Sequence, residues 1–118
     1  MGTGTLSIDL AAIAANWSAL DRFSTAETGA VVKADAYGTG IGRAARRLAQ
    51  TGARKFFVAV AEEAADIRQA IGPDPEIYIL SGHMSGDTDM IADLHVIPLL
   101  SSIDQILRHF EALPGTPF

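Results

Sequence analysis

Cysteine is absent from the chain, which excludes disulfide bridges and thiolate metal ligands and gives no sign of an oxidising compartment. No apolar run approaches the roughly 20 residues that a membrane-spanning helix needs. The first residues, Met1 to Thr5, carry neither basic side chains nor an apolar signal core. These absences predict a cytoplasmic protein. Basic residues are also scarce, and the net charge of -5 argues against nucleic acid, because phosphate neutralisation needs a basic face.

We assign no ligand-binding role to three small groups of charged or potentially metal-binding residues. They are Arg43, Arg46 and Arg47, then His83, His95 and His109, then Asp87 and Asp89. The arginines alternate with apolar residues at helical spacing, which predicts a solvated helix face. The histidines lack metal-ligand spacing and are interpreted as surface or capping residues. The aspartates lack the other oxygen ligands and the glycine of a calcium loop, so we expect no metal.

Short apolar runs alternate with helical patterns along the chain. Runs rich in β-branched and aromatic residues at 30–33, 56–60, 77–80 and 96–100 predict strands that are buried on both faces. Helices are predicted over 10–23, 41–50, 62–70 and 87–94, and after residue 102. Since strand and helix alternate four times, we expect an α/β fold with parallel strands and right-handed crossovers.

Capping residues support these helix boundaries. Asp9 precedes the first helix, in which Trp17 is interpreted as a core residue, and Gly52 follows the second helix as a C-cap. Ser102 and Gln105 have capping-box spacing at the start of the last helix. An apolar stripe follows in that helix, formed by Ile103, Ile106, Leu107 and Phe110.

Four βα units can form a small doubly wound sheet or half of a (β/α)8 barrel. The glycine-rich segment 38–42 lacks the spacing of a dinucleotide-binding fingerprint, which argues against the doubly wound alternative. A closed (β/α)8 barrel typically needs about 250 residues, with ~200 as a lower limit. A chain of 118 residues cannot close one.

Lysine occurs only twice, and Lys33 lies at the end of the first apolar run. An ammonium group among β-branched and small side chains loses hydration, which lowers its pKa and leaves an amine able to attack a carbonyl. The alternative is a lysine that buries its stem and keeps its ammonium in water, as we expect for Lys55 before the second strand. Tyr37 offers a phenol, and Gly38 and Gly40 permit a tight turn. Together these residues suggest a phosphorylated carbonyl cofactor.

The segment from Val31 to Gly40, with the sequence Val-Val-Lys-Ala-Asp-Ala-Tyr-Gly-Thr-Gly, closely resembles the pyridoxal-phosphate attachment segment of the alanine racemase family. Weaker resemblance continues at 8–10, 57–64, 77–82 and 98–102. The chain departs from the family pattern at Thr39, where the family usually has histidine. Threonine keeps a hydrogen-bonding group but loses a titratable nitrogen.

The resemblance implies that residues 1–118 are the N-terminal part, about four βα units, of a pyridoxal-phosphate-binding TIM (β/α)8 barrel domain. It implies that Lys33 is the Schiff-base lysine and a catalytic base, and that the phenol of Tyr37 reaches the cofactor phosphate. Val31 and Leu80 match apolar positions that line the cofactor, although either can equally be a core residue. Asp35 also falls in the motif, but an aspartate in a turn often accepts hydrogen bonds from neighbouring backbone amides, and we expect that local role.

The activity implied by the resemblance is interconversion of L-alanine and D-alanine, which supplies D-alanine for peptidoglycan. In the family the enzyme is a homodimer, and a tyrosine from a C-terminal β-domain of the partner subunit is the second base. That domain and the later barrel strands are not among these residues, so we expect an incomplete barrel with exposed edges that favour association. Two alternatives remain open: a cofactor-binding or carrier module without turnover, and an inactive truncated remnant. The substrate can be alanine, serine or another small amino acid.

Overall fold

Four parallel strands form the sheet of this α/β protein, whose computed structural model describes residues 2–118. The strands are β1 (Ala30–Val31), β2 (Lys55–Val58), β3 (Glu76–Ile79) and β4 (Ile97–Pro98), and they lie side by side in sequence order. A doubly wound sheet reverses its strand order, whereas a barrel adds each strand next to the previous one. The observed order therefore has the barrel topology, and β1 and β4 lie at its two edges, as expected.

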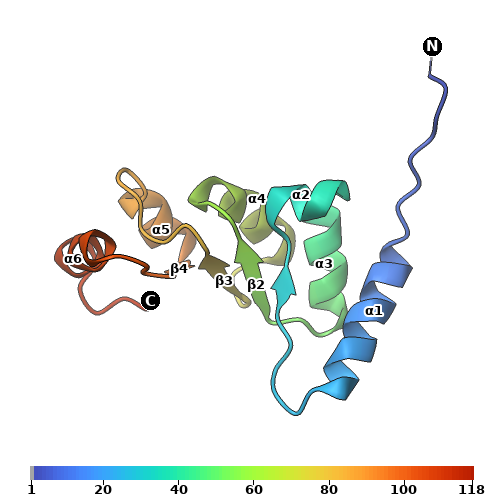
Figure 1. Ribbon diagram of the computed structural model, residues 1–118, viewed down its shortest axis with the longest axis horizontal. Helices are drawn as coiled ribbons and strands as arrows, with labels where there is room; N and C mark the ends of the chain where they lie inside the picture. Colours follow the sequence, from blue (N-terminus) through green and yellow to red (C-terminus); the bar gives the residue numbers. More distant parts are fainter. Residues whose placement is uncertain (1) are drawn as a thin grey trace.

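Six helices accompany the strands within residues 2–118, and for the five that were predicted the boundaries agree to within one or two residues. They are α1 (Leu10–Phe23), α2 (Lys33–Gly38), α3 (Ile41–Thr51), α4 (Ala61–Ile71), α5 (Thr88–Leu94) and α6 (Ile103–Ala112). Asp9 caps α1 by accepting a hydrogen bond from the amide of Ala12 at 3.0 Å. Gly52 ends α3 with φ of 129°. Figure 1 shows α1 beside α3 at one end of the molecule and α6 at the other end, beyond β4. Only α2 was not predicted.

One face of the sheet is packed and the other is open. Phe56, Val58, Ile77 and Ile79 have no solvent exposure and pack against the helices. The intervening residues of β1 to β4 form a register-aligned row, Val31, Phe57, Tyr78 and Ile97, that is exposed or half-buried. The prediction of strands buried on both faces is therefore wrong for residues 2–118, because the described helices cover only one side of the sheet.

The N-terminal and C-terminal helices differ in how well the apolar pattern predicts packing. Trp17 of α1 is half-buried and packs against the core, as expected. In α6 the apolar stripe faces solvent, with Ile103 74% and Leu107 54% exposed, while Gln105 and His109 are buried. The expected capping box is only half formed: Ser102 Oγ accepts from the amide of Gln105, but the Gln105 side chain accepts from the amide of Ser101. No helix within residues 2–118 is both long enough and apolar enough to cross a membrane.

Candidate functional site

Lys33 lies two residues beyond the end of β1, at the carboxyl edge of the sheet. The strand was expected to continue through Lys33, but it ends at Val31 and the chain then turns into α2. The Lys33 side chain is half-buried, and no group within residues 2–118 forms a hydrogen bond or ion pair with its amine. The amine is therefore uncommitted, whereas its loss of hydration stays a prediction. Parallel α/β folds place their ligands at this edge of the sheet.

The other lysine is differently placed. Lys55 is the first residue of β2 and thus lies at the amino ends of the strands, opposite the carboxyl ends. Its ammonium forms an ion pair with Glu27 at 3.3 Å. Its side chain is 37% exposed, in agreement with the expected solvent contact. The two lysines thus differ both in position and in whether the amine has a partner.

Lys33 leads into a left-handed helical turn. Ala34, Asp35, Ala36 and Tyr37 all have φ between 52° and 58°. For residues other than glycine this conformation costs about 1–2 kcal/mol each, so surrounding contacts must hold it. The turn keeps its own hydrogen bonds, from the amide of Ala36 to Val32 O at 2.9 Å and from the amide of Gly40 to Asp35 O at 3.0 Å.

Asp35 and Thr39 support the end of this turn. The Asp35 carboxylate accepts a hydrogen bond from the amide of Ile41, the first residue of α3, at 2.8 Å. The expected local role of Asp35 is therefore confirmed. The Thr39 hydroxyl donates to the carbonyl of Ala36 at 2.6 Å. At the position where the family usually has histidine, threonine thus closes a bond within the turn itself.

Glu63 supports the beginning of the turn, and sequence reasoning did not find it. One carboxylate oxygen accepts from the amide of Ala34 at 2.7 Å, and the other accepts from the amide of Ala59 at 2.8 Å and from that of Val60 at 3.3 Å. Glu63 lies in the first turn of α4, where acidic residues are common for reasons of helix capping alone. That signal predicts a cap but not a contact across 29 residues of sequence.

The remaining predicted site residues surround the same corner. Tyr37 is 65% exposed, and no described residue hydrogen-bonds its phenol. Val31, 49% exposed, lines an apolar hollow together with Tyr37, and residues of α1 and α3 complete its lining. Leu80 follows β3, two strands away, and is 37% exposed. Neither Val31 nor Leu80 belongs to the buried core. Val31 and Tyr37 thus line the same hollow, Lys33 lies between them in sequence, and Leu80 lies further along the same edge.

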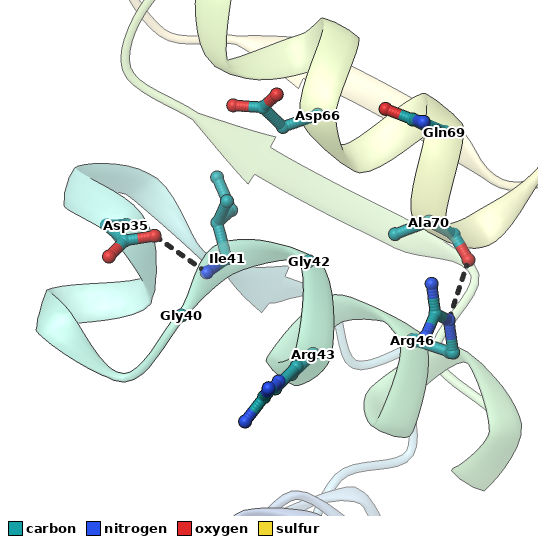
Figure 2. Close-up of a pocket in the computed structure, with 9 residues that line it drawn as sticks. All are labelled: Asp35, Gly40, Ile41, Gly42, Arg43, Arg46, Asp66, Gln69 and Ala70. Atoms are coloured by element: carbon teal, nitrogen blue, oxygen red, sulfur yellow. Dashed lines mark hydrogen bonds between the residues drawn. The ribbon is translucent and has the colours of Figure 1, made fainter.

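A shallow pocket on the helical side of the molecule is the main alternative site. Figure 2 shows it between the start of α3 and α4, with Arg43, Arg46 and Asp66 around it. Two of its polar groups are already engaged in the fold: Asp35 caps Ile41, and Arg46 donates to the carbonyl of Ala70 at 3.4 Å. All three arginines of the predicted cluster are exposed, as expected of a solvated helix face. Two of the polar groups that line the pocket thus already serve the fold.

His83 and His109 form a buried pair, so their interpretation as surface or capping residues is wrong. They are 0% and 1% exposed, and their Nδ1 atoms lie 3.1 Å apart. Their separation by 26 residues in sequence hides this contact from any local pattern. His95, in contrast, is exposed and ends α5 in a left-handed conformation with φ of 53°, as a capping residue does.

The hydrogen bonds around this pair assign its tautomers. Thr116 donates its hydroxyl proton to Leu113 O at 2.7 Å and must therefore accept from His109 Nε2, 3.1 Å away. His109 Nδ1 is then the acceptor for His83 Nδ1–H, and His83 Nε2 accepts from the hydroxyl of Thr88 at 2.8 Å. Burial lowers the pKa of His83, and His109 and Arg108 act in the same direction, against Asp87. Every ring nitrogen is used within the protein, so the pair is structural. Within residues 2–118 no group of three or more potential ligands could hold a metal ion.

The uncommitted groups at the carboxyl edge fit a ligand of a particular chemistry. A primary amine without a partner can form a covalent bond with an aldehyde, and a free phenol can donate to an anionic group such as a phosphate. The exposed side chain of Val31 beside them offers an apolar contact for a ring. The chemistry of these three residues fits pyridoxal phosphate, and the hydrogen bonds of the turn use neither the amine of Lys33 nor the phenol of Tyr37.

Sequence comparison relates the chain to one family over nearly its whole length. The family model described as alanine racemase, N-terminal domain, matches residues 8–117. The chain is 62% identical to the alanine racemase of Dinoroseobacter shibae and 59% identical to that of Cereibacter sphaeroides, in each case over 100% of the chain and 34% of the relative. The chain therefore spans about a third of the length of the curated relatives it matches.

Solved structures show the same relation. The crystal structure of alanine racemase from Bartonella henselae with covalently bound pyridoxal phosphate aligns with a TM-score of 0.81 at 38% identity, covering 86% of this chain and 30% of that one. The biosynthetic alanine racemase from Pseudomonas aeruginosa aligns with a TM-score of 0.82 at 30% identity, over 90% and 30% of the two chains. A histidine racemase from Leuconostoc mesenteroides aligns with a TM-score of 0.77 at 25% identity, over 91% and 29%.

Proposed function

The chain belongs to the alanine racemase family, and from this membership we propose that it forms the lysine-bearing, N-terminal part of a pyridoxal-phosphate-dependent alanine racemase barrel. The observation that carries the proposal is the uncommitted amine of Lys33 at the carboxyl edge of a parallel sheet, in the same turn segment as the free phenol of Tyr37. Both residues lie in the segment that the family model matches.

In this proposal each group of the corner has a separate task. Lys33 Nζ would hold the cofactor through its aldehyde group and would move a proton at the substrate Cα on one face. Tyr37 donates its phenol proton to the cofactor phosphate, and Val31 and Leu80 contact the ring and orient it. When bound, pyridoxal phosphate supplies an electron sink for the Cα–H bond that breaks.

The finer parts of the proposal concern the whole enzyme. Racemisation needs a second base on the opposite face of Cα, and the proposal assigns it to a tyrosine of a partner subunit in a homodimer. Interconversion of L-alanine and D-alanine in the cytoplasm would supply D-alanine for peptidoglycan. Substrate selection is assigned to segments beyond these four βα units, because a histidine racemase and several alanine racemases match the same portion.

Reductive trapping tests the assignment of the cofactor lysine. We expect that incubation of the chain with pyridoxal phosphate, followed by borohydride and peptide mapping, labels Lys33 in preference to Lys55. Lys55 is a matched control, because it is the second lysine of the same chain and its ammonium is paired with Glu27. Label mainly on Lys55, or label on neither lysine, would contradict the proposed function.

A cofactor-binding module without turnover is the second candidate, and the open face of the sheet favours it for the isolated chain. Solvent deuterium incorporation into both enantiomers of alanine separates the two candidates. Exchange into either enantiomer by the 118-residue chain alone would contradict the module, whereas label on Lys33 without exchange supports it.

A further inference from the structure

The conformation of the Lys33 corner depends on a residue of another βα unit. Ala34, the residue after the lysine, donates its amide proton to Glu63 of α4 at 2.7 Å. Its φ of 52° begins the run of four left-handed residues, none of which is glycine. Such a run persists only where surrounding contacts determine it. The Asp35 carboxylate fixes its far end on α3, so Glu63 is the contact that fixes its near end.

We propose that Glu63 is a positioning residue for Lys33: its carboxylate fixes the left-handed turn to the start of α4, and so sets where the amine lies relative to Tyr37. This inference rests on the proposed function for the role of Lys33. It concerns a residue that touches neither the amine nor the phenol, and acts through the backbone of Ala34.

The two carboxylate oxygens of Glu63 accept hydrogen bonds from two different segments of the chain. Oε1 accepts from the amides of Ala59 and Val60, which lie at the end of β2 and the start of α4. Among the described residues, Oε2 accepts from Ala34 alone. The carboxylate is thus a bridge between the carboxyl ends of β1 and β2. Neighbouring Glu62 lies in the same helical turn, is exposed and accepts no hydrogen bond from the described residues. It is a matched control.

Substitution of glutamine separates the two contacts. In Glu63→Gln the single carbonyl oxygen can keep the two donors of Ala59 and Val60, which leaves the amide NH2 facing Ala34 N–H, donor against donor. In Glu63→Ala all three contacts are lost. Loss of a hydrogen bond to a charged group corresponds to a change of about 10- to 100-fold in a local equilibrium.

Amide hydrogen exchange by NMR gives a readout that needs no cofactor. We expect exchange at Ala34 to become about 10- to 100-fold faster in Glu63→Gln, with Ala59 and Val60 close to the wild-type rate. Glu63→Ala should accelerate all three, and Glu62→Gln none. Unchanged exchange at Ala34 in Glu63→Gln would overturn the proposal.

Reductive trapping then asks whether the turn positions the amine. The ratio of label on Lys33 to label on Lys55, measured with pyridoxal phosphate, should fall about tenfold or more in Glu63→Gln and stay at the wild-type value in Glu62→Gln. A retained ratio together with faster exchange at Ala34 would show a purely structural contact and overturn the positioning role. A wild-type chain without label on Lys33 would instead refute the proposed function, and with it the positioning role, while exchange still reports whether Glu63 holds the turn.

Discussion

At the scale of single residues, the buried histidine pair shows how a neutral polar contact can depend on pH. The bond between the two Nδ1 atoms requires one donor and one acceptor. A proton added to His109 occupies Nδ1, which makes both Nδ1 atoms donors, whereas a proton added to His83 occupies Nε2 and removes the acceptor for the hydroxyl of Thr88. Burial lowers the pKa of His83, which means that the folded chain takes up this proton less readily than the unfolded chain.

The sign of the resulting pH dependence follows from linkage. An unfolded histidine titrates at about 6.5, and His83 titrates below that value when folded. Between the two pKa values the unfolded state binds more protons than the folded state. The contribution of neutral His83 to the free energy of unfolding is therefore complete above about pH 6.5 and decreases as the pH falls. We expect urea unfolding to show, as the pH falls below about 6.5, a decrease of at most about 1.4 kcal/mol per pH unit for this proton.

Two variants check whether His83 causes this slope. His83→Gln cannot titrate, so the slope should be smaller than in the wild type even if the variant is less stable at every pH. His95→Asn replaces an exposed histidine by a residue that tolerates its left-handed backbone, and should leave the slope unchanged. Equal slopes in wild type and His83→Gln would contradict the assignment.

At the scale of secondary structure elements, Arg68 joins α4 to α5 and to the loop before β3. Its guanidinium donates to four backbone carbonyls, those of Leu94, His95, Gly72 and Pro75, at 2.6–3.1 Å. Burial lowers the pKa of Arg68. Two of the acceptors, Leu94 and His95, lie at the end of α5, where carbonyls lack partners within the helix.

A lysine at this position cannot reproduce the planar set of donors. Arg68→Lys places at most three protons on one nitrogen, so carbonyls on at least one side lose their partner. We expect a loss of about 1–3 kcal/mol in the free energy of unfolding, measured with urea. Arg47→Lys, on the exposed face of α3, should change it by less than about 0.5 kcal/mol. Equal effects of the two substitutions would exclude the proposed role of Arg68 in joining these elements.

The secondary structure elements differ in how well the sequence predicts them. Helices were predicted closely because their signals are local: Asp9 caps α1 and Gly52 ends α3 as the pattern indicates. The left-handed conformation of the turn after β1 was not predicted, because alanine, aspartate and tyrosine give no sign of a left-handed backbone. One of the contacts that hold it comes from Glu63, 29 residues away from Ala34. A uniformly apolar run likewise does not mark where a strand ends.

The residues of the candidate site and its surroundings likewise differ in how far the sequence predicts them. The resemblance in the segment 31–40 identified Lys33 and Tyr37, and a local turn role for Asp35 could be reasoned from its residue type alone. The buried pair of His83 and His109 could not be found, since each residue contacts a partner in another element. In α6 the spacing correctly predicted a helix, yet its apolar stripe faces solvent while Gln105 is buried. Periodicity thus identifies a helix but not the neighbour that covers it.

At the scale of the whole molecule, sequential parallel pairing leaves two kinds of unpaired surface. The edge strands β1 and β4 each have a side without a strand partner among residues 2–118. Apolar side chains are exposed on the open face of the sheet and on α6, among them Val31, Leu80, Ile103 and Leu107. Exposed strand edges and apolar patches favour association. A net charge of -5 opposes it only weakly at moderate ionic strength.

We therefore expect the chain to associate reversibly, with a sedimentation coefficient that rises with protein concentration in analytical ultracentrifugation. The double variant Ile103→Glu and Leu107→Glu adds two charges to the exposed stripe of α6 and should shift association to higher concentration. Gln50→Glu and Gln69→Glu add the same charge at exposed positions of α3 and α4, and should behave as the wild type. If both pairs shift association equally, net charge rather than the stripe controls it. A wild-type chain that remains a cooperative monomer at every concentration would show that the open face is tolerated in water.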